Sequence, residues 1–377
     1  MASANKEKLK ELYNYTMKCA QGESSQTLFT HGGILLGLCE KRMISEARKY
    51  FDSLIVSGFS QEIVLYNIMV NGYVKLGCIE EAVKLYKLII EKGINPTIVT
   101  FNSLIYGFCK NGKLAQARQI LDTIKLHRLE PSAVTYTTLM DAYSEEGNIC
   151  CMLELLQDMK EKAIGPNHVT YTVIIKGLCK QRKLQESLQL LKDMYARGLT
   201  PDQITYNIII QSFCKARDFT KAFQLFEEML LHNLQPTSVT YNVLINGLCV
   251  YGDLIDAYRL LVSLQKQNVT LTKFAYTTII KGHSAKGDPQ ISVVLFHQMM
   301  ERGFQITIRD YSAIINRLCK RFLTSEAKYF YSLMLSSGIS PDPEICIMML
   351  NSFCHKGDLN SFSELLAEMI KSGVLPE

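Results

Sequence analysis

The sequence predicts an all-α fold, a right-handed superhelical α-solenoid of tandem 35-residue helix-turn-helix repeats. Frames of 35 residues fill 28–377 without insertion or deletion, and they open at 28, 63, 98, 133, 168, 203, 238, 273, 308 and 343. Seven of the nine prolines stand at the penultimate position of a frame, and eight frames carry an aromatic residue at their fourth position. A hairpin of this size cannot bury both of its faces, whereas stacked neighbours can, which favours a continuous core.

The frame 168–202 illustrates the two helices expected in each repeat. Thr170 is the expected N-cap of a first helix that extends to about Lys180. A polar break at 181–183 separates it from a second helix, which ends where Gly198 permits a left-handed cap and Pro201 prevents continuation. The apolar residues expected to face the core are Val173, Ile174, Ile175, Leu178, Cys179, Leu184, Leu188, Leu190, Leu191 and Met194.

Residues 1–27 precede the frames and are expected to form a separate N-terminal element. Leu9, Leu12, Tyr13 and Met17 make an apolar stripe within 6–20, which predicts a helix. This helix would be a truncated repeat or a cap over the first hairpin. The predicted organisation is therefore an N-terminal element at 1–27 and a ten-repeat solenoid at 28–377.

Composition excludes several classes of protein. The net charge of +5 with 20% charged residues is ordinary, and no apolar run approaches the roughly 18 residues that a membrane span needs. Twelve cysteines contain no Cys-x-x-Cys pair, so a structural zinc site is not expected, nor is any other metal or cofactor. Seven cysteines recur at the twelfth position, where we expect buried, reduced thiols: Cys39, Cys109, Cys179, Cys214, Cys249, Cys319 and Cys354.

Two segments carry a family resemblance. The stretches VTYTVIIKGLCKQRKLQESLQLLKDMYARGLTPD at 169–202 and VTYNVLINGLC at 239–249 resemble the pentatricopeptide repeat of plant organellar proteins. The resemblance covers about 350 of the 377 residues. The constant period resembles the P-type subclass, and the Gly-Leu-Cys-Lys motif resembles fertility-restorer-like members.

The resemblance implies a function and a location. Family members bind single-stranded RNA with one base per repeat, and the RNA runs 5′ to 3′ from the N-terminal repeat onward. It implies an organellar location, the mitochondrion in preference to the chloroplast, after removal of a transit peptide that this chain lacks. The role would be stabilisation, processing or translation of a transcript, with recruited factors as further partners, and no membrane.

Two positions per repeat are the expected base readers. The fifth residue of a frame and the last residue of that frame have a restricted set of polar side chains. For the fifth residue, helix capping or local backbone bonding is an alternative, and for the last residue, solvation after proline. The expected pairs are Asn67 with Thr97, Asn102 with Ser132, Thr137 with Asn167, Thr172 with Asp202, Asn207 with Thr237, Asn242 with Thr272, Thr277 with Thr307 and Ser312 with Asp342.

Donor and acceptor patterns connect these pairs to bases. An ionised Asp only accepts hydrogen bonds and suits guanine or uracil, whereas Asn also donates and suits adenine or cytosine. A short Thr at the fifth position leaves room for a purine, and a longer Asn reaches a pyrimidine. The expected target is near 5′-(C/U)-C-A-G-(C/U)-(C/U)-(A/G)-G-3′.

Two further sets of residues would supply affinity. Apolar residues at the second position are expected to clamp bases, as in the family, with packing between repeats as the alternative: Val64, Val99, Val134, Val169, Ile204, Val239 and Phe274. Lysines at the thirteenth position are expected to contact phosphates, with a helix-dipole role as the alternative: Lys75, Lys110, Lys180, Lys215 and Lys320.

Two other functions are considered, a protein-binding scaffold and a deaminase. A peptide- or protein-binding helical-repeat scaffold is the main alternative, but the 34-residue repeat with a characteristic Trp is absent, since the chain has no Trp. A deaminase would need His-x-Glu with Cys-x-x-Cys, and neither occurs. We therefore expect no enzymatic activity.

Overall fold

The computed structural model describes residues 28–371, which form twenty α-helices and one π-helical turn, with no strand in this range. The helix predicted within 6–20 lies outside the described residues. The chain divides into two compact units, of which the first ends at Thr200 and the second begins at Pro201. None of the helices in 28–371 is long and apolar enough to cross a membrane.

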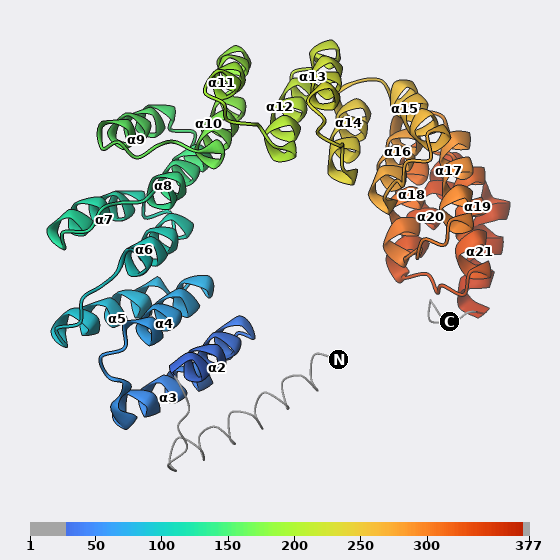
Figure 1. Ribbon diagram of the computed structural model, residues 1–377. Helices are drawn as coiled ribbons and strands as arrows, with labels where there is room; N and C mark the ends of the chain where they lie inside the picture. Colours follow the sequence, from blue (N-terminus) through green and yellow to red (C-terminus); the bar gives the residue numbers. More distant parts are fainter. Residues whose placement is uncertain (1–27, 372–377) are drawn as a thin grey trace. The chain divides into compact units, whose positions relative to one another are not determined.

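The first unit contains five helical hairpins (Figure 1). Its helices are α2 (Leu28–Glu40), α3 (Ile44–Leu54) continued by η1 (Ile55–Phe59), α4 (Ile63–Lys75), α5 (Ile79–Glu91), α6 (Ile98–Lys110), α7 (Leu114–Leu126), α8 (Ala133–Glu146), α9 (Ile149–Glu161), α10 (His168–Lys180) and α11 (Leu184–Ala196).

The second unit repeats the same arrangement five times. Its helices are α12 (Gln203–Lys215), α13 (Phe219–Leu231), α14 (Ser238–Tyr251), α15 (Leu254–Lys266), α16 (Lys273–Lys286), α17 (Pro289–Glu301), α18 (Ile308–Lys320), α19 (Thr324–Ser336), α20 (Pro343–Lys356) and α21 (Leu359–Lys371).

Within each unit the first helices of successive hairpins pack side by side. The row is α2, α4, α6, α8 and α10 in one unit, and α12, α14, α16, α18 and α20 in the other. Every first helix begins at the opening residue of a 35-residue frame. The prediction of an all-α solenoid of tandem hairpins is therefore confirmed.

A glycine explains why the first helices can approach each other closely. A Cβ atom at Gly72 would lie 2.6 Å from Cys39 Sγ, and one at Gly247 would lie 2.6 Å from Cys214 Cβ. At these two places the glycine at the tenth position of a frame lies against the cysteine of the preceding repeat. Any larger residue at this glycine would push neighbouring first helices apart.

The recurring cysteines form no disulfide within the described residues, and most are buried as expected. Burial raises the pKa of the Cys39 and Cys214 thiols to about 11, which leaves them protonated and unreactive. The expectation was wrong for Cys354, which is exposed, and Cys109 and Cys249 are only partly buried. Cys354 lies on α20, and no later first helix in the described range brings a glycine against it.

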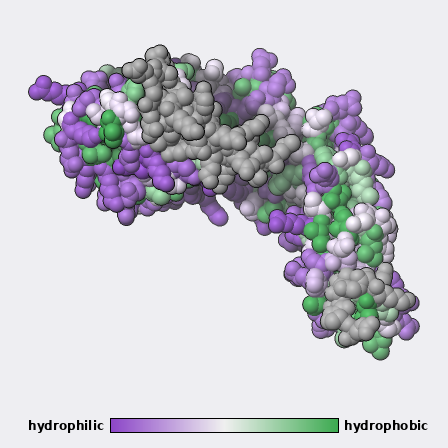
Figure 2. Space-filling view, turned by 90° about the horizontal axis from the view of Figure 1, so that it is seen from below, coloured by the Kyte–Doolittle hydropathy of each residue, from purple (hydrophilic) through white to green (hydrophobic). Residues whose placement is uncertain are grey.

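The recurring methionines of the second helices pack in the core. Six of them are fully buried: Met159, Met194, Met229, Met299, Met334 and Met369. On the face that Figure 2 shows, the apolar residues that remain exposed form patches among hydrophilic surface.

Candidate nucleic-acid interface

The last residue of a frame is the N-cap of the next repeat's first helix. The side chain of Asn167 accepts a hydrogen bond from the Thr170 backbone N–H at 3.0 Å, and Asp202 accepts one from the Thr205 N–H at 2.8 Å. The expectation that Thr170 itself is the cap was therefore wrong. Thr170 stands three residues inside the helix and completes a capping box with Asn167.

Capping also fixes which atom of the side chain remains for other contacts. Oδ1 of Asn167 accepts from both the backbone N–H and the hydroxyl of Thr170, at 3.0 and 3.1 Å. Oδ1 of Asp202 does the same with Thr205, at 2.8 and 2.8 Å. These bonds leave the amide nitrogen of Asn167 and the second carboxylate oxygen of Asp202. The two caps therefore differ in the group they can present, a donor in one and an acceptor in the other.

Asparagines at the fifth position bridge to the next repeat. Asn67 donates from Nδ2 to Thr97 Oγ1 at 3.1 Å and accepts from Thr100 Oγ1 at 2.6 Å. Asn242 Oδ1 accepts from Thr272 Oγ1 at 3.0 Å. The structure thus brings together the fifth and last residues in these two predicted pairs.

The pair of Asn102 with Ser132 is joined through a third residue. Thr135 Oγ1 donates to Asn102 Oδ1 at 2.7 Å and lies 3.1 Å from Ser132 Oγ. Sequence reasoning missed this connecting role, which Thr100 also plays. The sequence feature that could have indicated this role is the Thr that recurs at the third position of a frame, which the sequence pattern assigned to the cap. It occurs at Thr100, Thr135, Thr170, Thr205 and Thr240.

Threonines at the fifth position bond their own helix instead. Thr137 donates to Ala133 O at 2.8 Å, Thr172 to His168 O at 2.9 Å and Thr277 to Phe274 O at 3.1 Å. The alternative of local backbone bonding therefore accounts for these three hydrogen bonds.

The structure does not link every predicted pair. Oδ1 of Asn207 is buried and has no hydrogen-bond partner within the described residues, and no hydrogen bond joins it to Thr237. Ser312 and Asp342 are likewise not joined within that range, although Asp342 caps α20 by accepting from the Ile345 N–H at 2.8 Å. Thr172 and Asp202 belong to different units.

Apolar residues at the second position lie on the surface. Their exposed fraction is 43–61%, whereas the aromatic rings of Tyr136 and Tyr206 two residues later are fully buried. A role confined to packing between repeats would bury these side chains, so their exposure favours a contact with a ligand. The residues are Val64, Val99, Val134, Val169, Ile204, Val239 and Phe274.

A cavity opens beside one of these residues. It has a volume of about 660 Å³ and is lined by Thr137 and Val169 together with Tyr106, Lys110 and Glu145 among others. A predicted reader, a predicted clamp and a predicted phosphate contact therefore share one hollow in the first unit.

The thirteenth-position lysines are exposed but not equivalent. Lys180 Nζ pairs with the Glu145 carboxylate at 2.7 Å, and Lys176 Nζ approaches the same carboxylate at 2.6 Å. Hydrogen bonds from Lys176 and Lys180 lower the pKa of Glu145 to about 2. Ion pairs within 28–371 involve none of the other four, Lys75, Lys110, Lys215 and Lys320.

Known proteins with this architecture were found by sequence and by structure. A family described as "PPR repeat family" matches residues 61–110, 96–145, 131–180, 169–215 and 201–250. A second, "PPR repeat", matches 239–269, 274–304, 310–339 and 345–374. A putative pentatricopeptide repeat-containing protein of Arabidopsis thaliana is 52% identical over 63 residues, which are 17% of this chain and 6% of that protein.

Solved structures show the same fold. The pentatricopeptide repeat protein PPR10 in complex with an 18-nt psaJ RNA element matches with a TM-score of 0.50 and 18% identity, over 98% of this chain and 59% of that one. PPR10 from maize alone matches with a TM-score of 0.50 and 16% identity, over 98% and 62%. With family matches spanning most of its length, the chain belongs to the pentatricopeptide repeat family.

Proposed function

We propose that this chain binds single-stranded RNA and reads one base per repeat, without a catalytic step of its own. The observation that carries the proposal is the divided use of the cap side chain. One atom of Asn167 or Asp202 holds the helix terminus, and the other is left to meet a base. A fixed side chain with one remaining donor or acceptor is what discrimination between base edges requires.

The proposed assignment follows from the group that each pair presents. Asn67 with Thr97 takes a pyrimidine, Asn102 with Ser132 takes C, Thr137 with Asn167 takes A, and Thr172 with Asp202 takes G. Asn207 with Thr237 and Asn242 with Thr272 take pyrimidines, Thr277 with Thr307 takes a purine, and Ser312 with Asp342 takes G. The target is near 5′-(C/U)-C-A-G-(C/U)-(C/U)-(A/G)-G-3′.

Affinity would come from the other two residue sets. The half-exposed second-position side chains, such as Val134 and Val169, would sandwich bases between adjacent repeats. Lys75, Lys110, Lys215 and Lys320 would contact phosphates directly. Lys180 would first have to exchange its bond to Glu145 for one to RNA.

The biological setting is also a proposal. PPR10, solved in complex with an RNA element, shares the fold at 18% identity, and this chain spans 59% of it. We expect an organellar transcript, mitochondrial in preference to chloroplast, as the partner, with recruited processing or translation factors acting on it.

A protein-binding scaffold is the second candidate, because half-exposed Val and Ile side chains could also receive an apolar peptide. The two candidates differ in their dependence on salt. Binding through phosphate contacts weakens steeply as salt rises, whereas binding of an apolar peptide does not.

Selection from a random RNA pool tests the proposal. Enriched RNAs should contain the target motif in unstructured regions, because bases must be free to enter between repeats. A hairpin that pairs the motif into its stem serves as the control and should bind more weakly. Enrichment without a shared motif, or equal binding of stem and single strand, would contradict base readout.

A further inference from the structure

In two repeats the third residue of a frame contacts both predicted readers of the preceding base step. Thr100 is fully buried, accepts from the Thr97 backbone N–H at 3.1 Å and donates to Asn67 Oδ1 at 2.6 Å. Thr135 occupies the same place between Ser132 and Asn102. Because the third residue hydrogen-bonds to both readers, its side chain determines which donor and acceptor groups of the readers are still available to a base.

The frame that opens at Ile308 carries Asp310 at this position instead of Thr. Its Oδ2 accepts from the Thr307 backbone N–H at 2.9 Å, from Thr307 Oγ1 at 2.8 Å and from Lys273 Nζ at 2.6 Å. The Asp310 side chain is 14% exposed. The predicted reader Thr307 is therefore bound to a carboxylate rather than to a hydroxyl.

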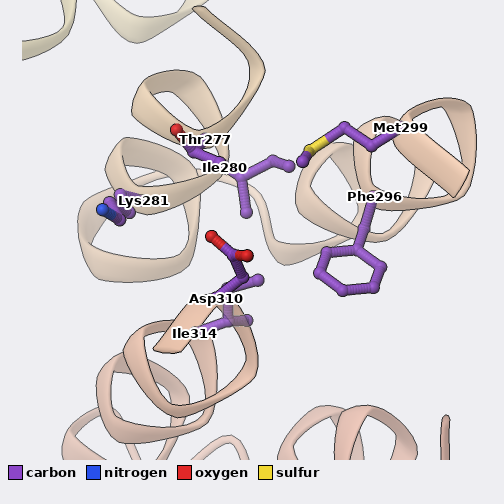
Figure 3. A pocket seen from close by; sticks show the side chains of 7 residues that line it. All are labelled: Thr277, Ile280, Lys281, Phe296, Met299, Asp310 and Ile314. Atoms are coloured by element: carbon purple, nitrogen blue, oxygen red, sulfur yellow. The ribbon is translucent and has the colours of Figure 1, made fainter. Parts of the chain in front are cut away.

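Figure 3 shows how Asp310 lies against the preceding repeat. Its carboxylate points from α18 toward α16, where the other predicted reader, Thr277, lies with Ile280 and Lys281. The hollow between them has a volume of about 10 Å³, roughly the space of one water molecule. The carboxylate thus stands beside the pair that would read the seventh base.

Hydrogen-bond direction follows from the chemistry of the carboxylate. Burial raises the pKa of Asp310, but the hydrogen bonds from Lys273 and Thr307 lower it by more, so that its net pKa lies below the usual value. Ionised Asp310 only accepts, so Thr307 must give it the single hydroxyl proton. Thr307 Oγ1 also receives the Asp310 backbone N–H in a capping box. Thr307 Oγ1 then has one lone pair available, so it can only accept a further hydrogen bond.

We propose that Asp310 is a specificity-determining residue that makes the Thr277 and Thr307 pair a guanine reader. An acceptor faces the ring N–H of guanine favourably, whereas the unprotonated ring nitrogen of adenine would oppose it. This inference rests on the proposed RNA-binding function and narrows its seventh base from A or G to G. A Thr at position 310 could either donate to or accept from the Thr307 hydroxyl, so it would not impose the direction of that hydroxyl.

The test compares four RNAs that differ only at the seventh base, with wild type and Asp310→Thr. Thr is the residue that six other frames carry at this position, so the hairpin should fold, and thermal unfolding followed by circular dichroism checks this. Wild type should bind the G RNA about five-fold or more tighter than the A RNA, on the scale of a typical mismatch. In Asp310→Thr the ratio should fall to within about two-fold. A merely structural role would weaken all four RNAs equally.

A second pair of variants keeps Asp310 in place. Thr307→Ser retains the hydroxyl and should retain the preference for G, whereas Thr307→Val removes it and should lose that preference. A wild type that prefers A, or an unchanged ratio in Asp310→Thr or Thr307→Val, would overturn the inference. If Asp202→Asn still changes the base preferred at the fourth position, base readout by the repeats is supported although the inference about Asp310 is wrong. If wild type binds none of the RNAs, both the proposed function and the inference are wrong.

Discussion

The caps at Asn167 and Asp202 are a natural matched pair. Each ends a frame whose fifth residue is Thr, each caps the following helix, and each uses Oδ1 to accept from the backbone and hydroxyl of a buried Thr. They differ in one group, NH₂ in Asn167 and O⁻ in Asp202. Oδ1 thus holds the helix start in the same way at both sites, while the hydrogen-bonding character of the remaining group is opposite.

The comparison shows how stability and specificity can share one side chain. Either residue satisfies an otherwise unpaired N–H at the helix start, so either supports the fold. Exchange of the two residues should therefore alter recognition with little effect on folding. Removal of either should affect both.

Truncation of the caps should have the largest effect. Asn167→Ala and Asp202→Ala each remove a cap, at about 0.5–2 kcal/mol of unfolding free energy. Each should also erase discrimination at its base, which is worth about 1–3 kcal/mol. Denaturant unfolding and binding to single-base RNA variants measure the two losses. Lost stability with unchanged base preference would mean that the caps do not read bases.

Loss of the hydroxyl beneath each cap should have an intermediate effect. Thr170→Val and Thr205→Val keep the buried volume but remove one hydrogen bond to Oδ1, at a cost of about 1 kcal/mol. The freed side chain should discriminate less, at the third base for Thr170→Val and the fourth for Thr205→Val. Thr138→Val is a control, because within 28–371 the Thr138 hydroxyl donates to the Val134 carbonyl of its own helix and to no cap. A control variant that reduces discrimination as much would refute the orienting role.

The smallest effect concerns charge next to the Asn167 site. Four lysines without ion pairs predict a salt slope of about −3, at roughly 0.7 per phosphate contact. Glu145→Gln should release Lys180 and steepen the slope by about 0.7. Glu146→Gln removes the same charge, but Glu146 has no ion pair within 28–371, so the slope should stay. Equal slopes in all three proteins would show that Lys180 does not reach a phosphate.

Much of the fold followed from the 35-residue register, including the end of α10 at Lys180 and the start of α11 at Leu184, whereas α10 begins at His168, before the predicted cap Thr170. The cap was misassigned because Asn167 and Thr170 are both residues that caps prefer. The two residues differ in backbone conformation, which is extended at the cap Asn167 and helical at Thr170, the third helical residue that completes the capping box.

Contacts between repeats were harder to predict than the repeats themselves. Glu145 and Lys180 share one position in adjacent frames, and their ion pair follows once first helices are known to stack side by side. The bridge from Thr100 to Asn67 needed side-chain geometry, because a buried Thr at a helix start is also a common packing residue. The 35-residue period predicts that hairpins stack on one another. Which side-chain atoms meet between neighbouring hairpins follows only from the three-dimensional structure.

The most direct test exchanges the two caps. Wild type and the double variant Asn167→Asp with Asp202→Asn are titrated with four RNAs that carry A-G, G-A, A-A or G-G at the third and fourth bases. The account predicts that wild type binds A-G best, that the double variant binds G-A best, and that both unfold at similar denaturant concentrations. A double variant that still prefers A-G, or that weakens for all four RNAs alike, would contradict readout by the cap side chains.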